Sequence, residues 1–329
     1  MSEGLSTRLS GPRPTPRPTG SGTISILFAS VLWGSTGTVA SFAPDGIPAS
    51  AVGAAGLMFG GLLLFLTARD NRLPHNRFEW IVLAVGAIAV AIYPVTFYPA
   101  VARTGVAVAT VTALGSAPMF AGLLAWATGR GRPARRWVIA TAISVIGCAA
   151  LVLGPELTGT GTPLDPIGIA LAACGGLTYA VYSLAGATLI ARGHTSNAVM
   201  GVMFGLAALL VTPVVLRSGI DWLTTPRGAL VTTHLAVFTC FLAYRLFGYG
   251  LRHTGVETAT TLTLAEPAVA AVLGITVIGE RLPLPSWCGM AVLAVGLAVL
   301  TLPSPVRAAP IWSAFANRRS TRSGRRRAR

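Results

Sequence analysis

The stretch Gly56-Leu57-Met58-Phe59-Gly60 recurs almost unchanged as Gly201-Val202-Met203-Phe204-Gly205. The match continues to a threonine at the same offset, Thr67 in the first copy and Thr212 in the second. Similarity at a fixed spacing is the signature of a repeated architecture, and it sets the fold before any single element does. The chain is therefore predicted to contain two equivalent halves.

Other landmarks recur in the same order. They are Arg103-Thr104-Gly105-Val106 with His253-Thr254-Gly255-Val256, Pro118 with Pro267, and Trp137 with Trp287. Chance similarity among apolar segments is the alternative, but it does not explain why glycine, proline and tryptophan coincide in register. We therefore interpret the segments around 23–153 and 166–302 as two copies of one unit.

The composition indicates which solvent surrounds these units. The chain is 53% hydrophobic and only 11% charged, whereas a soluble domain carries about 25% charged residues. The charges also lie between long apolar stretches, as expected where about 20 apolar residues cross roughly 30 Å of hydrocarbon. The fold class predicted is an all-α integral membrane protein.

Ten apolar segments are long enough to span a bilayer. They run approximately over 23–43, 48–67, 80–101, 105–128, 136–153, 166–191, 197–216, 229–251, 257–278 and 285–302. Five spans per half is an odd number, so the second half must cross the membrane in the opposite direction to the first. Inverted repeats of this kind place a substrate site at their interface near the midplane.

Orientation follows from the arginines, which supply every basic residue because lysine is absent. With the N-terminus in the cytoplasm, twenty arginines lie on the cytoplasmic side, and only Arg103, Arg217, Arg227 and Arg281 lie outside. Arg245 falls inside the eighth span. Cytoplasmic loops are enriched in Lys and Arg, so both termini are predicted to be cytoplasmic, in the plasma membrane.

The remaining segments connect or flank the two units. Residues 1–22 are rich in Pro, Gly, Ser, Thr and Arg, which is typical of a disordered lead-in; 154–165 are expected to form an external linker, and 303–329 a basic cytoplasmic tail. The net charge of +15 is attributed to this topology, so we expect the tail to bind anionic lipid headgroups rather than nucleic acid. The four cysteines stand alone in apolar segments, and no metal site or cofactor is predicted from them.

Within this pattern the sequence resembles the drug/metabolite transporter superfamily, of the ten-helix type with two EamA domains. The resemblance rests on Leu32-Trp33-Gly34-Ser35, Ser116-Ala117-Pro118, Ala265-Glu266-Pro267 and Gly279-Glu280-Arg281. It implies an inner-membrane carrier, often an exporter of amino acids or other small metabolites. One departure is Gly129-Arg130, where the family often has Gly-Glu, so any role of that acidic residue is left to Glu280 alone.

Glu266 is the leading candidate for a transport residue. It lies about nine residues into the ninth span, or roughly 14 Å from its start, where an unpaired carboxylate is costly. One hypothesis is that it lines a substrate cavity and exchanges a proton or contacts a cationic group. The other is a protonated glutamate that holds helix packing, and the sequence leaves both open.

Further candidates surround it. Arg245 either extends toward the cytoplasmic interface or binds an anion, such as Glu266 or a substrate carboxylate. The prolines are expected to kink their helices and free backbone carbonyls, that of Thr263 in the case of Pro267. The aromatic side chains either pack or stack on a ligand. These prolines and aromatic residues are Pro94, Pro99, Pro118, Trp33, Tyr98, Tyr179, Tyr244 and Tyr249, with Tyr93 and Tyr182 beside them.

The function predicted is a secondary transporter of small metabolites, amino acids or amphipathic drugs, working by alternating access and more often as an exporter. An integral membrane enzyme is the alternative from another class, but the four histidines are scattered and no nucleophile or metal-ligand spacing appears. A scaffold or sensor that transports nothing is the third. Gly56 with Gly60 and Gly201 with Gly205 have the spacing of helix-packing seams, within the chain or in a homodimer.

Overall fold

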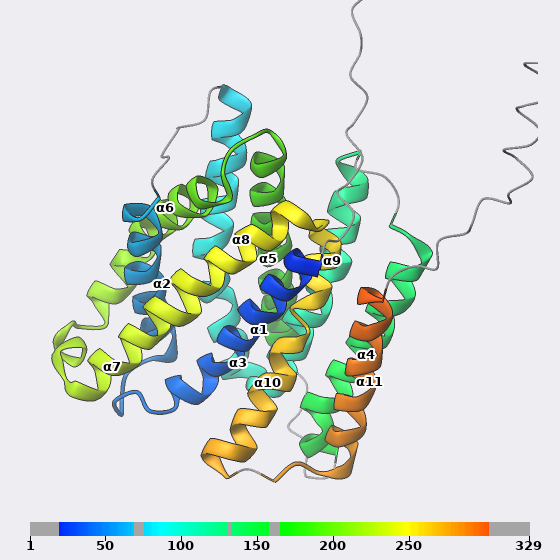
Figure 1. Ribbon diagram of the computed structural model, residues 1–329. Coiled ribbons are helices and arrows are strands. Elements are labelled where there is room, and N and C mark those ends of the chain that lie inside the picture. Colours follow the sequence, from blue (N-terminus) through cyan, green and yellow to red (C-terminus); the bar gives the residue numbers. More distant parts are fainter. Residues whose placement is uncertain (1–19, 69–75, 130–132, 158–164, 280, 303–329) are drawn as a thin grey trace, which may run out of the picture.

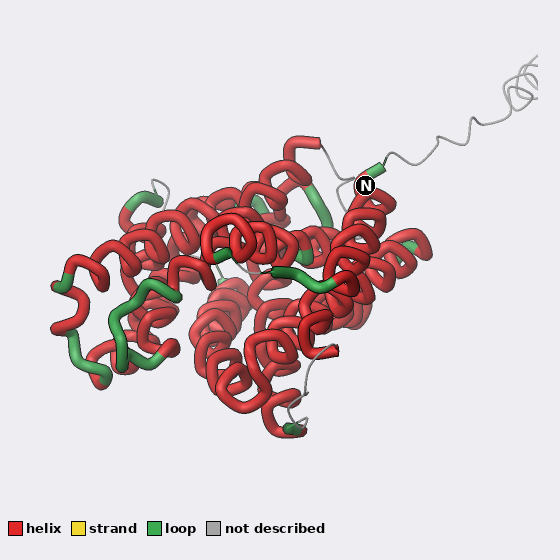
Figure 2. Tube along the Cα trace, turned by 90° about the horizontal axis from the view of Figure 1, so that it is seen from below, coloured by secondary structure: helices red, strands yellow, loops and turns green. Residues whose placement is uncertain are grey.

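A computed structural model of the chain describes residues 20–68, 76–129, 133–157, 165–279 and 281–302. Over these ranges the chain forms helices and loops without strands (Figure 2). Ten of the helical stretches are long and apolar enough to cross a membrane. The predicted fold class is confirmed. The predicted lead-in up to residue 19, Arg130, Glu280 and the tail from residue 303 lie outside the described residues.

The first half contains four continuous helices that carry five spans. These are α1 (Gly20–Ala40), α2 (Ala49–Leu66), α3 (Arg77–Ala127) and α4 (Arg135–Leu157). Helix α1 begins three residues inside the predicted lead-in, and α4 continues four residues into the segment expected as a linker. Both differences are extensions of a predicted helix at its end, where sequence boundaries are least certain.

Helix α3 holds two spans, Arg77–Val101 and Val108–Ala127, and folds back on itself between them. A Cβ on Gly175 of the sixth span would lie 3.6 Å from Thr96 Oγ1 and 3.9 Å from Ala113 Cβ. A straight helix would separate Thr96 from Ala113 by about 25 Å. The chain therefore reverses direction near Gly105, where the sequence predicted a new span.

The second half is more interrupted. It contains α5 (Pro166–Ala191), α6 (Ser196–Arg217), η1 (Asp221–Thr224), α7 (Pro226–His234), η2 (Leu235–Leu242), α8 (Ala243–His253), α9 (Val256–Leu262), α10 (Ala265–Leu273), η3 (Gly274–Ile278) and α11 (Leu284–Thr301). Together α7, η2 and α8 form the eighth span, and α9, α10 and η3 form the ninth. The segment η2 is a π-helix, a geometry that often marks functional sites.

Equivalent spans of the two halves pack against each other in opposite directions. In the pair α2 and α6, Gly61 faces Phe204 and Ala208, whereas Gly201 faces Leu64 and Ala68. Residue numbers therefore rise along one helix as they fall along the other. Since these are the second spans of their halves, their antiparallel contact is direct support for the inverted repeat.

The fifth spans of the two halves repeat this arrangement at the other end of the molecule (Figure 1). In the pair α4 and α11, Gly147 faces Leu293, and Gly154 faces Ser286. A Cβ on Gly289 would collide with the backbone of Leu151. Small residues let transmembrane helices approach closely. The two glycine seams frame a central group that contains α1, α3, α5, α8 and α10.

The glycines of the opening repeat all pack inside the chain. Gly56 lies against Leu235, and Gly60 against Cys240 of the π-helix η2. Gly201 and Gly205 lie against the last turns of α2, at Leu64 and Phe65. A homodimer therefore has to use other surfaces than these four glycines.

Candidate functional site

The ninth span is broken in its middle, immediately before Glu266. Helix α9 ends at Leu262 and α10 begins at Ala265. Pro267 has no amide to donate to the Thr263 carbonyl, one turn earlier. The Glu266 amide donates to that carbonyl instead, at 3.0 Å. The Thr263 carbonyl, which the sequence predicted to be free, is thus satisfied by a tighter turn. This turn places Glu266 in the first turn of α10.

Thr263 joins this break to the sixth span. Its hydroxyl donates to the Thr260 carbonyl at 2.8 Å and accepts a hydrogen bond from the Tyr179 hydroxyl at 2.9 Å. Both Tyr179 and Thr263 are buried. Buried polar groups are expensive unless paired, so this chain of two hydrogen bonds fixes α5 against the break.

Aromatic rings from three spans pack around the same region. Trp33 of α1 donates from Nε1 to the Thr239 carbonyl of η2 at 2.9 Å. Its ring centroid lies 5.0 Å from that of Tyr244 and 6.4 Å from that of Tyr179. The hydroxyls of Tyr182 and Tyr244 are 3.0 Å apart. Trp33, Tyr179, Tyr182 and Tyr244 are called the aromatic cluster below.

Glu266 lies beside this cluster. Its carboxylate lies within electrostatic range of Tyr93, Tyr179 and Tyr244, and of the Cys148 thiol on α4. Its side chain is only half-buried, and among the described residues it makes no hydrogen bond or ion pair. Glu266 is therefore a carboxylate that has neighbours from several spans and no hydrogen-bond or ion-pair partner among the described residues.

Helix α1 approaches Glu266 through a glycine. A Cβ on Gly34 would lie 2.9 Å from the Glu266 carbonyl oxygen and 2.7 Å from Val269 Cβ. The next residue, Ser35, has its hydroxyl 2.9 Å from His234 Nε2. Three consecutive residues of α1 therefore contact spans eight and nine: Trp33 through its indole, Gly34 by leaving room for the Glu266 backbone, and Ser35 through its hydroxyl.

Two predicted site residues lie away from this region. Arg245 donates from Nη2 to the Thr67 hydroxyl at 2.6 Å, just past the end of α2, and its guanidinium lies 5.3 Å from the Phe241 ring centroid. It thus extends toward a helix end and not toward Glu266. Tyr249 is 40% exposed, and its ring lies 4.4 Å from that of His253.

The remaining candidates lie on α3. The Tyr93 and Phe97 rings stack at 5.5 Å, and Tyr98 fills the space beside Gly53 of α2. Pro94 and Pro118 are buried and Pro99 is exposed. The helix continues through all three prolines, so the ninth span is the place where a proline coincides with a break.

Two contributors to the site were not predicted. Thr239 was one polar residue in an apolar run, and nothing in the sequence indicated that its carbonyl would accept from Trp33. Gly34 stands in the sequence only as one residue of the family pattern Leu32-Trp33-Gly34-Ser35. One feature could have indicated its role. Glycine is unfavourable in the interior of a helix, so a glycine next to Trp33 in the middle of a predicted span indicates a close approach of another helix.

These features define a class of protein: a polytopic membrane protein of two inverted halves with hydrogen-bonded polar side chains buried between its helices. The model of the EamA-like transporter family matches residues 20–153 and 166–302. The chain belongs to this family.

Individual relatives agree with that assignment. The uncharacterized transporter YwfM of Bacillus subtilis (strain 168) is 35% identical over 84% of this chain and 92% of its own length. The uncharacterized inner membrane transporter YicL of Salmonella typhimurium is 27% identical over 87% and 97%. The threonine/homoserine exporter RhtA of Escherichia coli (strain K12) is 31% identical over 44% and 47%. A solved crystal structure has a TM-score of 0.71 at 21% identity, over 85% of this chain and 96% of that one, which supports the fold alone.

Proposed function

We propose that this transporter moves a small metabolite carrying an amino group, by alternating access and in the direction of export. The observation that carries the proposal is the Glu266 carboxylate, which lies near aromatic side chains of other spans and is unpaired within the described residues. An ammonium group gains both an ion pair with this carboxylate and cation–π attraction from nearby rings. The aromatic cluster contains no cationic side chain that would compete for the carboxylate.

The relatives supply the rest of the support. RhtA is named as an exporter of threonine and homoserine, and both of these compounds carry an amino group and little apolar surface. The inverted halves supply two related conformations, as alternating access requires. A proton on Glu266 in one conformation and a substrate in the other would couple the two movements.

Transport by proteoliposomes tests the proposal. Glu266→Gln removes the negative charge and keeps the size, so we expect uptake of amino compounds to fall at least tenfold. Glu257→Gln is the matched control, because Glu257 lies in the same span at the start of α9. Undiminished transport with an unchanged pH profile in Glu266→Gln would exclude the proposed role. A protein that moves no solute at all would be a scaffold or sensor instead.

The orientation is part of the same proposal. Both termini are expected to be cytoplasmic because twenty arginines lie on that side and four on the other. A cysteine placed at Arg217, between spans seven and eight, should react with a membrane-impermeant maleimide added outside intact cells. A cysteine at Arg192, between spans six and seven, should react only after the cells are opened. The reverse pattern would overturn the orientation.

A further inference from the structure

The repeated motifs Arg103-Thr104-Gly105-Val106 and His253-Thr254-Gly255-Val256 have no role in the site described above. The first lies between the third and fourth spans, and the second between the eighth and ninth. Five spans separate them. The two motifs therefore lie at opposite faces of the membrane, whichever face is outside.

Each motif packs against the first turn of a helix from the other half. A Cβ on Gly168, at the start of α5, would collide with the Thr104 methyl and lie 3.0 Å from Arg103 Cβ. A Cβ on Gly22, at the start of α1, would lie 2.7 Å from His253 Cβ and 3.2 Å from the Thr254 methyl. The pairings match residue for residue.

The two threonines are also held alike. The Thr104 hydroxyl donates to the Ala100 carbonyl at 2.9 Å, and the Thr254 hydroxyl to the Gly250 carbonyl at 3.0 Å. Thr104 is 4% exposed and Thr254 is 2% exposed. The same closed joint is thus built twice, once at each face. The contact of Gly168 with Thr104 is called the α5 joint, and that of Gly22 with His253 and Thr254 the α1 joint.

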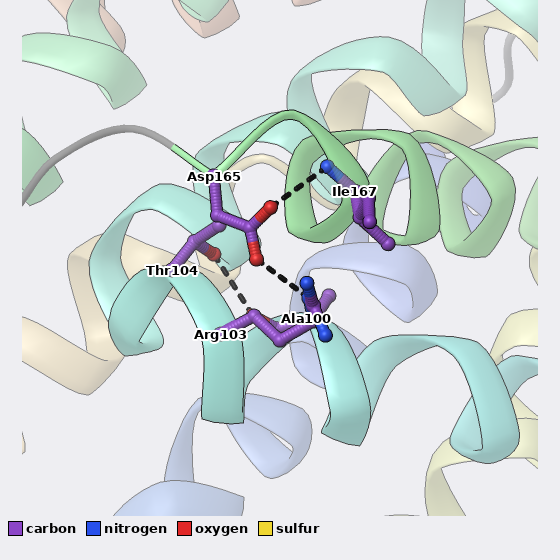
Figure 3. Close-up of polar contacts among 5 residues, drawn as sticks. All are labelled: Ala100, Arg103, Thr104, Asp165 and Ile167. Carbon is purple, nitrogen blue, oxygen red and sulfur yellow. Dashed lines mark hydrogen bonds and ion pairs between the residues drawn. The ribbon is translucent and has the colours of Figure 1, made fainter.

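The α5 joint carries an ion pair (Figure 3). Arg103 Nε donates to Asp165 Oδ2 at 2.5 Å. The other oxygen, Oδ1, accepts from the Ile167 amide at 3.0 Å, so Asp165 is also the N-cap of α5. One carboxylate therefore fastens the first turn of α5 to the connection between spans three and four. At the α1 joint the corresponding side chain, His253, packs on Tyr249.

We propose that the two joints are the gates at the two membrane faces, and that the Arg103–Asp165 ion pair is a latch that biases the α5 joint toward its closed position. This rests on the proposed alternating-access function. In an inverted repeat, the two conformations exchange the environments of equivalent elements. The first turns of α1 and α5 are equivalent, so opening one joint and closing the other is the movement that the symmetry provides.

Cysteine labelling tests the latch without any substrate. Thr104→Cys is introduced into a protein whose native cysteines, Cys148, Cys174, Cys240 and Cys288, are replaced by alanine. A membrane-impermeant maleimide is then added to the face that carries Asp165. Because Thr104 is buried when the joint is closed, the labelling rate reports opening. Asp165→Asn should raise the rate about two- to fivefold, the range expected for a partly exposed ion pair.

The variants are chosen to isolate the charge. Asparagine remains a good N-cap, so Asp165→Asn removes the ion pair and keeps the start of α5. Arg103→Gln, which leaves Asp165 intact, should have the same effect. Asp221→Asn is the matched control, since Asp221 is exposed between spans seven and eight, on the same face. Equal labelling rates in Asp165→Asn, Asp221→Asn and the parent would overturn the latch.

A disulfide tests whether the joint must open. The Cβ of residue 168 would lie 3.5 Å from Thr104 Cβ, a separation that a disulfide accepts. Oxidation of the Thr104→Cys, Gly168→Cys double variant should abolish transport, and a reductant should restore it. Full transport in the oxidised protein would overturn the gate. Absence of transport in both the parent and the reduced protein, with the labelling result intact, would instead reject the proposed function.

Discussion

Replacing Gly34 with alanine should separate the first span from Glu266. The new Cβ would lie 2.7 Å from Val269 Cβ and 2.9 Å from the Glu266 carbonyl oxygen. Carbon atoms pack best at about 3.5–4.0 Å, so α1 has to move by roughly 1 Å. Gly37, three residues further along the same helix, has nothing within 4 Å of its Cβ position. Gly34→Ala and Gly37→Ala are therefore the same chemical change, and they differ only in whether the new methyl group meets another helix.

The expected magnitude follows from this comparison. Alanine is favoured over glycine in a helix by about 1 kcal/mol, and this gain applies to both variants and cancels between them. Overpacking costs about 1–3 kcal/mol and applies only at Gly34. Thermal unfolding in detergent should therefore show Gly34→Ala to be less stable than Gly37→Ala by that amount, with transport lost in the first variant alone. Equal stability and equal transport would refute the close approach of α1 to Glu266.

Three further predictions concern the surrounding contacts. Tyr179→Phe removes the hydrogen bond to Thr263 and should destabilise the protein by about 0.5–1.5 kcal/mol and slow transport, as measured by unfolding and by uptake. Arg245→Ala should lower the melting temperature but leave the KM unchanged, because Arg245 contacts Thr67; a raised KM would indicate a binding role. The hydrogen bond from Arg103 holds the pKa of Asp165 below its usual value of about 3.9. The stabilisation that this hydrogen bond provides is fully present above the usual pKa and is lost as the pH falls through the lowered pKa of Asp165. The difference in melting temperature between the parent and Asp165→Asn should therefore disappear at acidic pH.

Much of the fold was predictable because the lipid bilayer and the internal repeat both limit how the chain can fold. The spans follow from the thickness of the hydrocarbon, and the inverted relation follows from an odd number of spans per half. The antiparallel contact of Gly147 with Leu293 was not predictable, since a sequence gives the order of helices and not their neighbours. The fold-back of α3 was predicted near Gly105, but its uninterrupted helical backbone was not.

The site was only partly predictable, for a related reason. Glu266 stood out because a carboxylate at that depth is costly, and this holds without knowledge of neighbours. The partner of Trp33 is the Thr239 carbonyl, more than 200 residues away, and any backbone carbonyl in the apolar segments was an equal candidate. Arg245 was ambiguous because its reach allows several partners, and the structure gives it Thr67.

The two halves share a backbone plan but not their chemistry. Both equivalent prolines lie where a glycine of another span comes close: Gly34 approaches Glu266 before Pro267, and Gly176 approaches the backbone of Ala117 before Pro118. A symmetric framework gives two conformations of similar energy, whereas a carrier with one coupling site needs the charge only once. Ala117 is fully buried, so a glutamate introduced there would have to fit between packed helices, and burying its carboxylate without a partner would cost several kcal/mol. Ala117→Glu should therefore fail to restore transport to Glu266→Ala, as measured in proteoliposomes. Restored transport would mean that the two halves are interchangeable in chemistry as well as in backbone.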